Sequence, residues 1–292
     1  MAIYEIKNEV LTAKINTLGA ELVSLVQNET GKEYIWNADP TYWNRRSPIL
    51  FPFVGCAKNS SYLYEGKQYP ASQHGFARDM EFDLNFKEDA EIWFQITQTE
   101  ETKEVYPFDF TLMLGYVLED NSLLVKWKVI NDGAKDMHFS IGAHPAFLCP
   151  NHDGDKQTDC KLRFDCKSGF TYGQINDEGL MVSDSNYLTL DQGEVPIDEH
   201  FFDEGVYIIE NDQTHAIALV GSNQKAYVTV KFDAPLVGVW SPVKKNAPFI
   251  CIEPWYGRCD RADFIGELSE REWSNTLEPQ QTFEAFYTIS VK

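Results

Sequence analysis

The feature that most constrains this chain is an alternation of apolar and polar residues that recurs from one end to the other. It is clearest at residues 92–97, 123–129 and 282–291, where every second side chain is apolar. Successive side chains of a strand point to opposite faces, so this pattern predicts strands with one buried face. Further strand candidates cover residues 3–7, 10–16, 20–27, 108–118, 137–142, 206–210, 215–221 and 226–233.

Turn-forming clusters separate these candidates, for example at residues 119–122 and 131–133. Closely spaced strands joined by hairpin turns favour an all-β fold, a large antiparallel β-sandwich. We expect one domain over residues 1–292, because no linker rich in Pro, Gly or Ser divides the chain. Residues 150–200 are the most polar part and are expected to form an irregular connection. Helix is expected only as a short segment at 268–277 and a turn at 39–45.

Composition and charge narrow the possible partners. The 292 residues are 43% hydrophobic and carry a formal net charge of −20. Nucleic acids and anionic membranes attract basic surfaces, so neither is an expected partner. No apolar run reaches the roughly 18–20 residues of a membrane span. The first residues lack the basic start and apolar stretch of a signal peptide, so we expect a cytoplasmic protein.

The cysteines give little support for metal or redox chemistry. Six are spread through the chain, at positions 56, 149, 160, 166, 251 and 259, and none forms a CxxC pair. In a protein without an export signal, such residues are expected to be reduced thiols packed as small apolar groups. We therefore expect no metal site and no redox-active dithiol.

One glutamate stands out at the end of an apolar run, Phe249–Gly257. Glu253 precedes Pro254, and proline cannot donate to a sheet ladder, so we expect the strand to stop there. A carboxylate among apolar neighbours loses solvation, which raises its pKa and makes it a plausible proton acceptor near neutral pH. The alternative is a structural glutamate paired with Arg258 or Arg261.

Two histidines and a pair of arginines lie in similar settings. His74 is followed by a glycine, and His144 sits between small residues and a proline, so both have room for a ligand beside them. Arg45 and Arg46 precede an extended apolar segment, where a guanidinium could bind hydroxyls or a carboxylate. Either arginine could instead only neutralise the acidic surface.

Several common catalytic motifs are absent, namely GxSxG, the P-loop, GxGxxG after a strand, and HExxH. The remaining candidates are two histidines, a carboxylate, an arginine and many aromatic residues. Such a set supplies a general acid, a general base, hydroxyl-binding donors and flat apolar platforms. A sugar suits that pocket, because its C–H faces stack on aromatic rings while its hydroxyls need fixed polar partners.

Four segments in this order resemble the aldose 1-epimerase (galactose mutarotase-like) family, and most closely its LacX-type branch. They are Arg46–Pro52, Gln73–Arg78, Gly142–Phe147 and Cys251–Trp255. The resemblance covers about residues 3–290. It implies the galactose mutarotase-like supersandwich, a large antiparallel β-sandwich, and an isomerase that interconverts the anomers of a hexose without a cofactor.

The resemblance also implies roles for individual residues. Glu253 matches the family's general base on the anomeric hydroxyl, and His144 its general acid toward the ring oxygen. His74 matches a second histidine near the ring oxygen, and Arg46 an arginine that orients hydroxyls. A family aspartate matches Asp203 best, with Asp198 as the rival.

Further substrate contacts are expected from Arg78 and Trp255. Two alternatives to a hexose mutarotase stay open: a hexose-6-phosphate mutarotase, which Arg45, Arg46 and Arg78 would serve, and a catalytically silent carbohydrate-binding protein. The expected partner is a small sugar, either free or phosphorylated, and the expected assembly is a monomer or homodimer.

Overall fold

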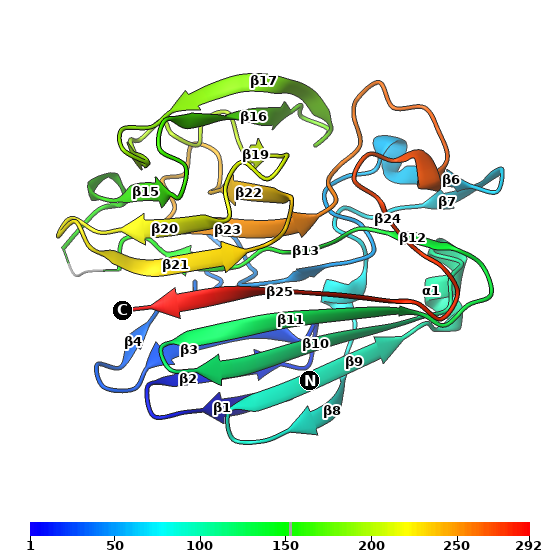
Figure 1. Cartoon of the computed structure of the whole chain (residues 1–292), viewed down its shortest axis with the longest axis horizontal. Helices are drawn as coiled ribbons and strands as arrows, with labels where there is room; N and C mark the ends of the chain where they lie inside the picture. The colour runs from blue at the N-terminus through cyan, green and yellow to red at the C-terminus, as the bar shows by residue number, and fades with distance from the viewer. Residues whose placement is uncertain (152–153) are drawn as a thin grey trace.

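Two large antiparallel sheets dominate the molecule, as the computed structural model in Figure 1 shows for residues 1–151 and 154–292. The nine-stranded sheet has the order β18 (Glu194–Pro196), β15 (Lys161–Phe164), β20 (Ala216–Val220), β21 (Ala226–Phe232), β25 (Thr282–Val291), β11 (Ser122–Asn131), β10 (Phe110–Glu119), β9 (Glu91–Thr97) and β8 (Asp83–Lys87). The eight-stranded sheet has the order β17 (Met181–Thr189), β16 (Gly169–Ile175), β19 (Tyr207–Ile209), β22 (Leu236–Trp240), β23 (Phe249–Tyr256), β13 (Ile141–Ala143) and β5 (Ile49–Leu50), with β14 (Ala146–Leu148) paired to β23.

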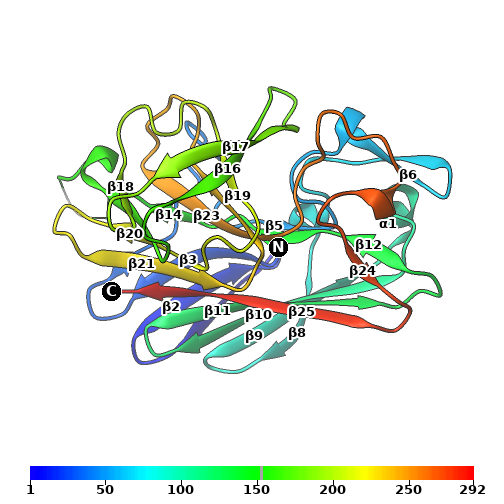
Figure 2. The same cartoon turned by 45° about the horizontal axis from the view of Figure 1, so that its top comes forward.

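Smaller sheets complete the fold (Figure 2). A four-stranded sheet contains β1 (Ile3–Lys7), β2 (Leu11–Asn16), β3 (Glu21–Gln27) and β4 (Lys32–Glu33). One two-stranded sheet is the hairpin of β6 (Ser61–Tyr64) and β7 (Lys67–Pro70), and another pairs β12 (Met137–Phe139) with β24 (Asn275–Leu277), which is distant in sequence. The helical elements are α1 (Glu100–Val105) and 3₁₀ turns at Lys58–Ser60, Ala77–Asp79, Gln157–Asp159 and Leu268–Glu270.

The predicted alternation places the core on one face of the nine-stranded sheet. In β11, Leu123, Val125, Trp127 and Val129 are at most 2% exposed, while the side chains between them are half-buried. Each such side chain stabilises the fold by about 1.5–3 kcal/mol relative to an exposed position. Trp127 contacts Tyr256 of the eight-stranded sheet, so this buried face packs against it. The predicted antiparallel β-sandwich is confirmed.

Several local predictions were wrong. Residues 137–142 form two short strands rather than one, and 268–277 forms a 3₁₀ turn and a strand rather than a helix. Residues 39–45 form turns without a helix, while α1 was not anticipated. Residues 150–200, apart from 152–153, which lie outside the described part, are not irregular, because they supply β15 to one large sheet and β16 and β17 to the other.

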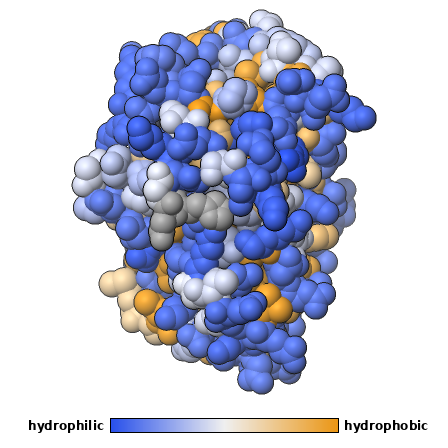
Figure 3. Space-filling model, turned by 90° about the vertical axis from the view of Figure 1, so that its left-hand side faces the viewer, coloured by the Kyte–Doolittle hydropathy of each residue, from blue (hydrophilic) through white to orange (hydrophobic). Residues whose placement is uncertain are grey.

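The face seen in Figure 3 is largely hydrophilic, with small scattered apolar areas. Among the described residues, no helix has the length and apolar character needed to span a membrane.

Candidate active site

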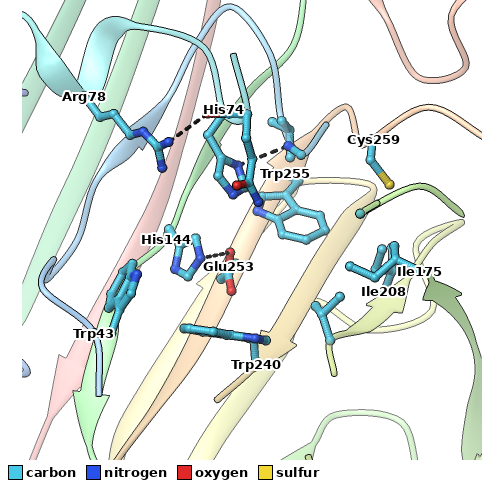
Figure 4. Close-up of a pocket in the computed structure, with 15 residues that line it drawn as sticks. Trp43, His74, Arg78, His144, Ile175, Ile208, Trp240, Glu253, Trp255 and Cys259 are labelled. Carbon is cyan, nitrogen blue, oxygen red and sulfur yellow. Dashed lines mark hydrogen bonds and ion pairs between the residues drawn. The ribbon is translucent and has the colours of Figure 1, made fainter. Parts of the chain in front are cut away.

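A cavity of about 250 Å³ opens beside the eight-stranded sheet. Its polar wall contains Gln73, His74, Arg78, His144 and Glu253, and its apolar wall includes Trp43, Trp240, Trp255, Ile175 and Ile208. Figure 4 shows Glu253 near the middle of the cavity beside His144, with Arg78 at one end and Ile175 and Ile208 at the other. Pockets for drug-sized ligands measure about 300–1,000 Å³, so this cavity suits a smaller molecule.

Glu253 lies inside strand β23, not at its end. The strand continues through Pro254 to Tyr256, and Glu253 is paired in register with Gly238 of β22. The predicted stop at Pro254 was therefore wrong. Because alternate residues of a strand share a face, Glu253 and Trp255 both face the cavity.

The tryptophan beside Pro254 explains why the strand tolerates a proline. In the antiparallel register with β13, the amide of residue 254 would donate to the carbonyl of Ala143, which Pro254 cannot do. The indole Nε1–H of Trp255 donates to that carbonyl instead, at 3.2 Å. This hydrogen bond satisfies a buried acceptor and fixes the indole as one wall of the cavity.

Two glycines leave space for the same indole ring. A Cβ atom on Gly142 of β13 or on Gly238 of β22 would lie 2.5 Å from carbon atoms of Trp255. Both strands neighbour β23 in the sheet, so the ring lies across three strands. Only glycine at these two positions lets the indole lie flat on the sheet.

Glu253 contacts His144 rather than an arginine. Their Oε2 and Nε2 atoms are 3.3 Å apart, and the two side chains are 1% and 10% exposed. Arg258 binds Glu210 and Glu272, while Arg261 binds Asp184. The alternative of a structural arginine partner for Glu253 is therefore wrong.

Burial shifts the two groups of this pair in opposite directions. Loss of solvation raises the pKa of the Glu253 carboxyl well above its usual range. Loss of solvation, followed by the positive charges of Arg78 and Arg45, lowers the pKa of His144 to about 3. In the empty cavity the neutral forms are favoured, with a proton on Glu253 and a neutral imidazole on His144.

The backbone around His144 positions its ring over β23. His144 and Pro145 connect β13 to β14, and both of these strands pair with β23. The amide of Ile252 in β23 donates to the carbonyl of Pro145 at 3.3 Å. The His144 ring stacks on Trp43 at 4.7 Å between centroids. Its edge contact with Trp240, at 5.4 Å, further restricts the ring.

His74 is held in a tight turn on the same side of the cavity. Its Nδ1 accepts a hydrogen bond from the amide of Gly55 at 3.1 Å, and its own amide donates to the Gly55 carbonyl at 2.9 Å. Burial lowers the pKa of His74 well below its usual range, so the neutral ring carries its proton on Nε2. The following residue, Gly75, has φ +70°, and a Cβ there would lie 2.2 Å from the Phe51 carbonyl oxygen.

The arginines are divided between the cavity and its surroundings. Arg78 lines the cavity and donates to the Gln73 carbonyl at 2.8 Å. Arg45 is paired with Asp79 at 2.8 Å. Arg46 does not line the cavity, because its guanidinium turns away to the Asn37 carbonyl at 3.0 Å. The structure thus places Arg78, and not Arg46, where a ligand would bind.

The aspartates expected from the sequence also lie elsewhere. Asp203 accepts a hydrogen bond from His200 Nδ1 at 2.9 Å, and Asp198 accepts from the His200 amide. Both line a separate shallow cleft. The loop 198–205 folds on itself through these contacts, so neither aspartate reaches the cavity.

Sequence reasoning missed the apolar wall apart from Trp255. Trp43 lies in the stretch read as a helical turn, and Trp240 ends a strand that was not among the candidates. Ile175 and Ile208 come from β16 and β19, far apart in sequence. The only available signal was the glycine two residues before Trp240, since a glycine inside a strand marks a close approach.

The cavity therefore brings two groups that can exchange protons, Glu253 and His144, within contact distance of each other. The neutral N–H of His74 and the flat rings of the tryptophans lie beside them. That arrangement can take a proton from one atom of a small polar ligand and give one to a neighbouring atom.

The family model described as "Aldose 1-epimerase" matches residues 2–290. The plasmid-encoded protein LacX of Lactococcus lactis subsp. lactis is 31% identical over 296 residues, covering 98% of each chain. A galactose mutarotase related enzyme from Lactobacillus acidophilus has a TM-score of 0.94 at 32% identity, covering 100% of this chain and 97% of its own. A galactose mutarotase-like protein from Lactobacillus casei ATCC 334 has a TM-score of 0.90 at 32% identity, covering 100% of both chains.

Proposed function

Since this chain belongs to the aldose 1-epimerase family, we propose that it is a mutarotase that interconverts the α and β anomers of a free hexose. The observation that carries the proposal is the 3.3 Å contact between Glu253 and His144 inside the cavity. Family membership supports mutarotase-type chemistry, and the pair supplies the two groups that this chemistry needs.

Opening the sugar ring requires two proton transfers, one at each of the two oxygens bonded to C1. A base removes the proton of the C1 hydroxyl, an acid protonates the ring oxygen, and the bond between C1 and the ring oxygen breaks to leave an aldehyde. Both oxygens are bonded to C1, so the base and acid have to lie close together. Glu253 and His144 meet this requirement, with Glu253 as base and His144 as acid.

The pair then recloses the ring with its roles exchanged. Opening leaves the proton on Glu253 and a neutral His144. After rotation about C1–C2, His144 takes the proton from the C5 hydroxyl while Glu253 protonates the aldehyde oxygen, and the starting protonation state returns. The raised pKa of Glu253 and the lowered pKa of His144 favour a protonated Glu253 and a neutral His144, which is the state present when the sugar is open. These shifts therefore lower the free energy of the ring-opened intermediate.

The other cavity residues bind and orient the sugar. The Nε2–H of His74 is a donor for the ring oxygen or a neighbouring hydroxyl. The faces of Trp255 and Trp240 are platforms for the C–H face of the ring. Arg78 provides donors for hydroxyls at the polar end of the cavity.

A 6-phosphorylated sugar has weaker support. A phosphate would favour two or three arginines that converge on it. Of the three candidates, Arg78 lines the cavity, whereas Arg45 is paired with Asp79 and Arg46 binds the Asn37 carbonyl. A catalytically silent sugar-binding protein would need neither member of the buried Glu253–His144 pair. We therefore place both behind the free-hexose mutarotase.

Polarimetry of freshly dissolved α-glucose and α-galactose tests the proposal. We expect catalysed decay of the optical rotation, faster than in buffer and proportional to protein concentration. A rate equal to that of buffer, together with a sugar-dependent rise in the melting temperature, would instead identify a binding protein. A strong preference for glucose 6-phosphate over glucose would favour the phosphorylated substrate.

We expect Gly238→Ala to slow mutarotation, because its new Cβ atom would push the Trp255 indole into the cavity. Overpacking of this kind costs about 1–3 kcal/mol of stability. The measurement is kcat/KM by polarimetry together with the melting temperature.

Gly115→Ala is the matched control, since its Cβ would lie 2.5 Å from the Trp93 indole on the strand pair β9–β10, away from the cavity. It should leave kcat/KM unchanged. Equal rates for both variants would show that the indole position does not matter for the reaction.

A further inference from the structure

Three potential metal ligands meet at the edge of the cavity, where His144 and Glu253 line it and Cys251 is buried behind them. Within the described residues, one ligand atom each from His144, Cys251 and Glu253 lies within 4.8 Å of the other two, and all three residues are buried. Cys251 and Glu253 are two residues apart on β23, so they share the face that His144 covers. Sequence spacing gave no sign of this cluster, because His144 comes from another segment.

The donor set and its dimensions suit zinc. A nitrogen, a sulfur and a carboxylate oxygen are the ligands that zinc prefers, at bond lengths of about 2.0–2.3 Å. At tetrahedral angles, two such ligands lie about 3.4 Å apart. The Nε2 and Oε2 atoms are already 3.3 Å apart. All three ligand atoms lie within 4.8 Å of one another, so the Cys251 sulfur needs to approach by roughly 1.4 Å at most.

A second observation indicates that the cluster has unused coordinating capacity. Glu253 Oε2 is fully buried and accepts no hydrogen bond from any described residue. Such an orphaned carboxylate oxygen is uncommon in a folded protein and asks for a proton or a cation beside it. Because Glu253 and His144 also line the cavity, a fourth coordination position would face the open space.

We propose that His144, Cys251 and Glu253 form a binding site for Zn²⁺ or a similar borderline divalent cation, and that occupancy inhibits the reaction. Binding replaces the thiol proton of Cys251 and the carboxyl proton of Glu253, which leave to solvent, while the neutral imidazole coordinates directly. The cation then holds the Nε2 and Oε2 lone pairs that would exchange protons with a sugar. Inhibition, but not binding, rests on the proposed mutarotase function.

Titration of the reduced, metal-free protein with Co²⁺ tests the site directly. We expect one equivalent to produce a thiolate-to-cobalt charge-transfer absorption and the intensified visible bands of a four-coordinate centre. Zn²⁺ should displace the Co²⁺, abolish the bands and slow mutarotation, and a chelator should restore the rate.

Replacement of single cysteines identifies the sulfur ligand. Cys251→Ala should abolish the charge-transfer band. It should also weaken metal binding by more than about 10–100-fold, which is the usual effect of losing a residue that only supports a ligand. Cys259→Ala, which removes a thiol that lines the cavity but lies outside the cluster, should keep the band. Absence of the band in the unmodified protein, or its persistence after Cys251→Ala, would overturn the proposal. If the bands form but no sugar is mutarotated, the metal site stands and the proposed function fails.

Discussion

We expect Glu253→Gln to reduce kcat for mutarotation by about 10²–10⁴-fold, the usual contribution of a positioned general acid or base. Glutamine has nearly the same shape but cannot accept and return a proton. The rate is measured at equilibrium by exchange of ¹H NMR magnetisation between the two anomeric protons. Mutarotation also proceeds without a catalyst, so the residual rate should approach that of buffer.

The fold should survive this substitution. Burial raises the pKa of Glu253, so the free protein already holds a neutral carboxyl there, and a neutral amide replaces it without stranding a charge. The melting temperature is therefore expected to change by only a few degrees. Glu284→Gln, an exposed carboxylate on β25 paired with Lys128, is the control and should keep the full rate. A fully active Glu253→Gln protein would exclude Glu253 as the base.

His144→Gln is expected to cost a similar factor, about 10²–10⁴ in kcat. The amide can still donate a hydrogen bond from a comparable position, but it cannot transfer a proton to the ring oxygen. KM should change less than kcat, because the sugar keeps its contacts with Trp255 and His74. His138→Gln, which alters a histidine bonded to Thr276 outside the cavity, should leave both constants unchanged.

The double variant Glu253→Gln/His144→Gln tests whether the two groups act as one proton-transfer unit or contribute independently. If Glu253 and His144 act as one unit, removing both costs little more than removing either, as for other groups that act together. Multiplicative losses would show that each group works alone, which the proposed cycle does not allow.

The alternation of side chains was enough to predict the sandwich, because a strand with one buried face leaves a period of two in the sequence. Residues 150–200 escaped this reading, since β17 is mostly exposed and so lacks apolar alternation. The stop at Pro254 failed for a different reason. The acceptor that residue 254 leaves vacant is satisfied by the Trp255 side chain, and no pattern along the strand records that hydrogen bond.

The site residues that belong to short characteristic segments could be predicted from the sequence. Those that several strands bring together only in the folded sheet could not. Glu253, His144, His74, Arg78 and Trp255 line the cavity, as the quoted segments suggested. Arg46 and Asp203 do not, because a side chain's direction depends on neighbours such as Asn37 and His200. Trp43, Trp240 and the Cys251 cluster arise only from the folded arrangement.

A crystal structure of the protein with bound galactose tests the central claim most directly. We expect the anomeric and ring oxygens to lie within about 2.6–3.2 Å of the Glu253 carboxylate and His144 Nε2, respectively. We also expect the sugar ring to lie against Trp255 or Trp240. A sugar bound with C1 toward Ile175 and Ile208, out of reach of Glu253 and His144, would contradict the account.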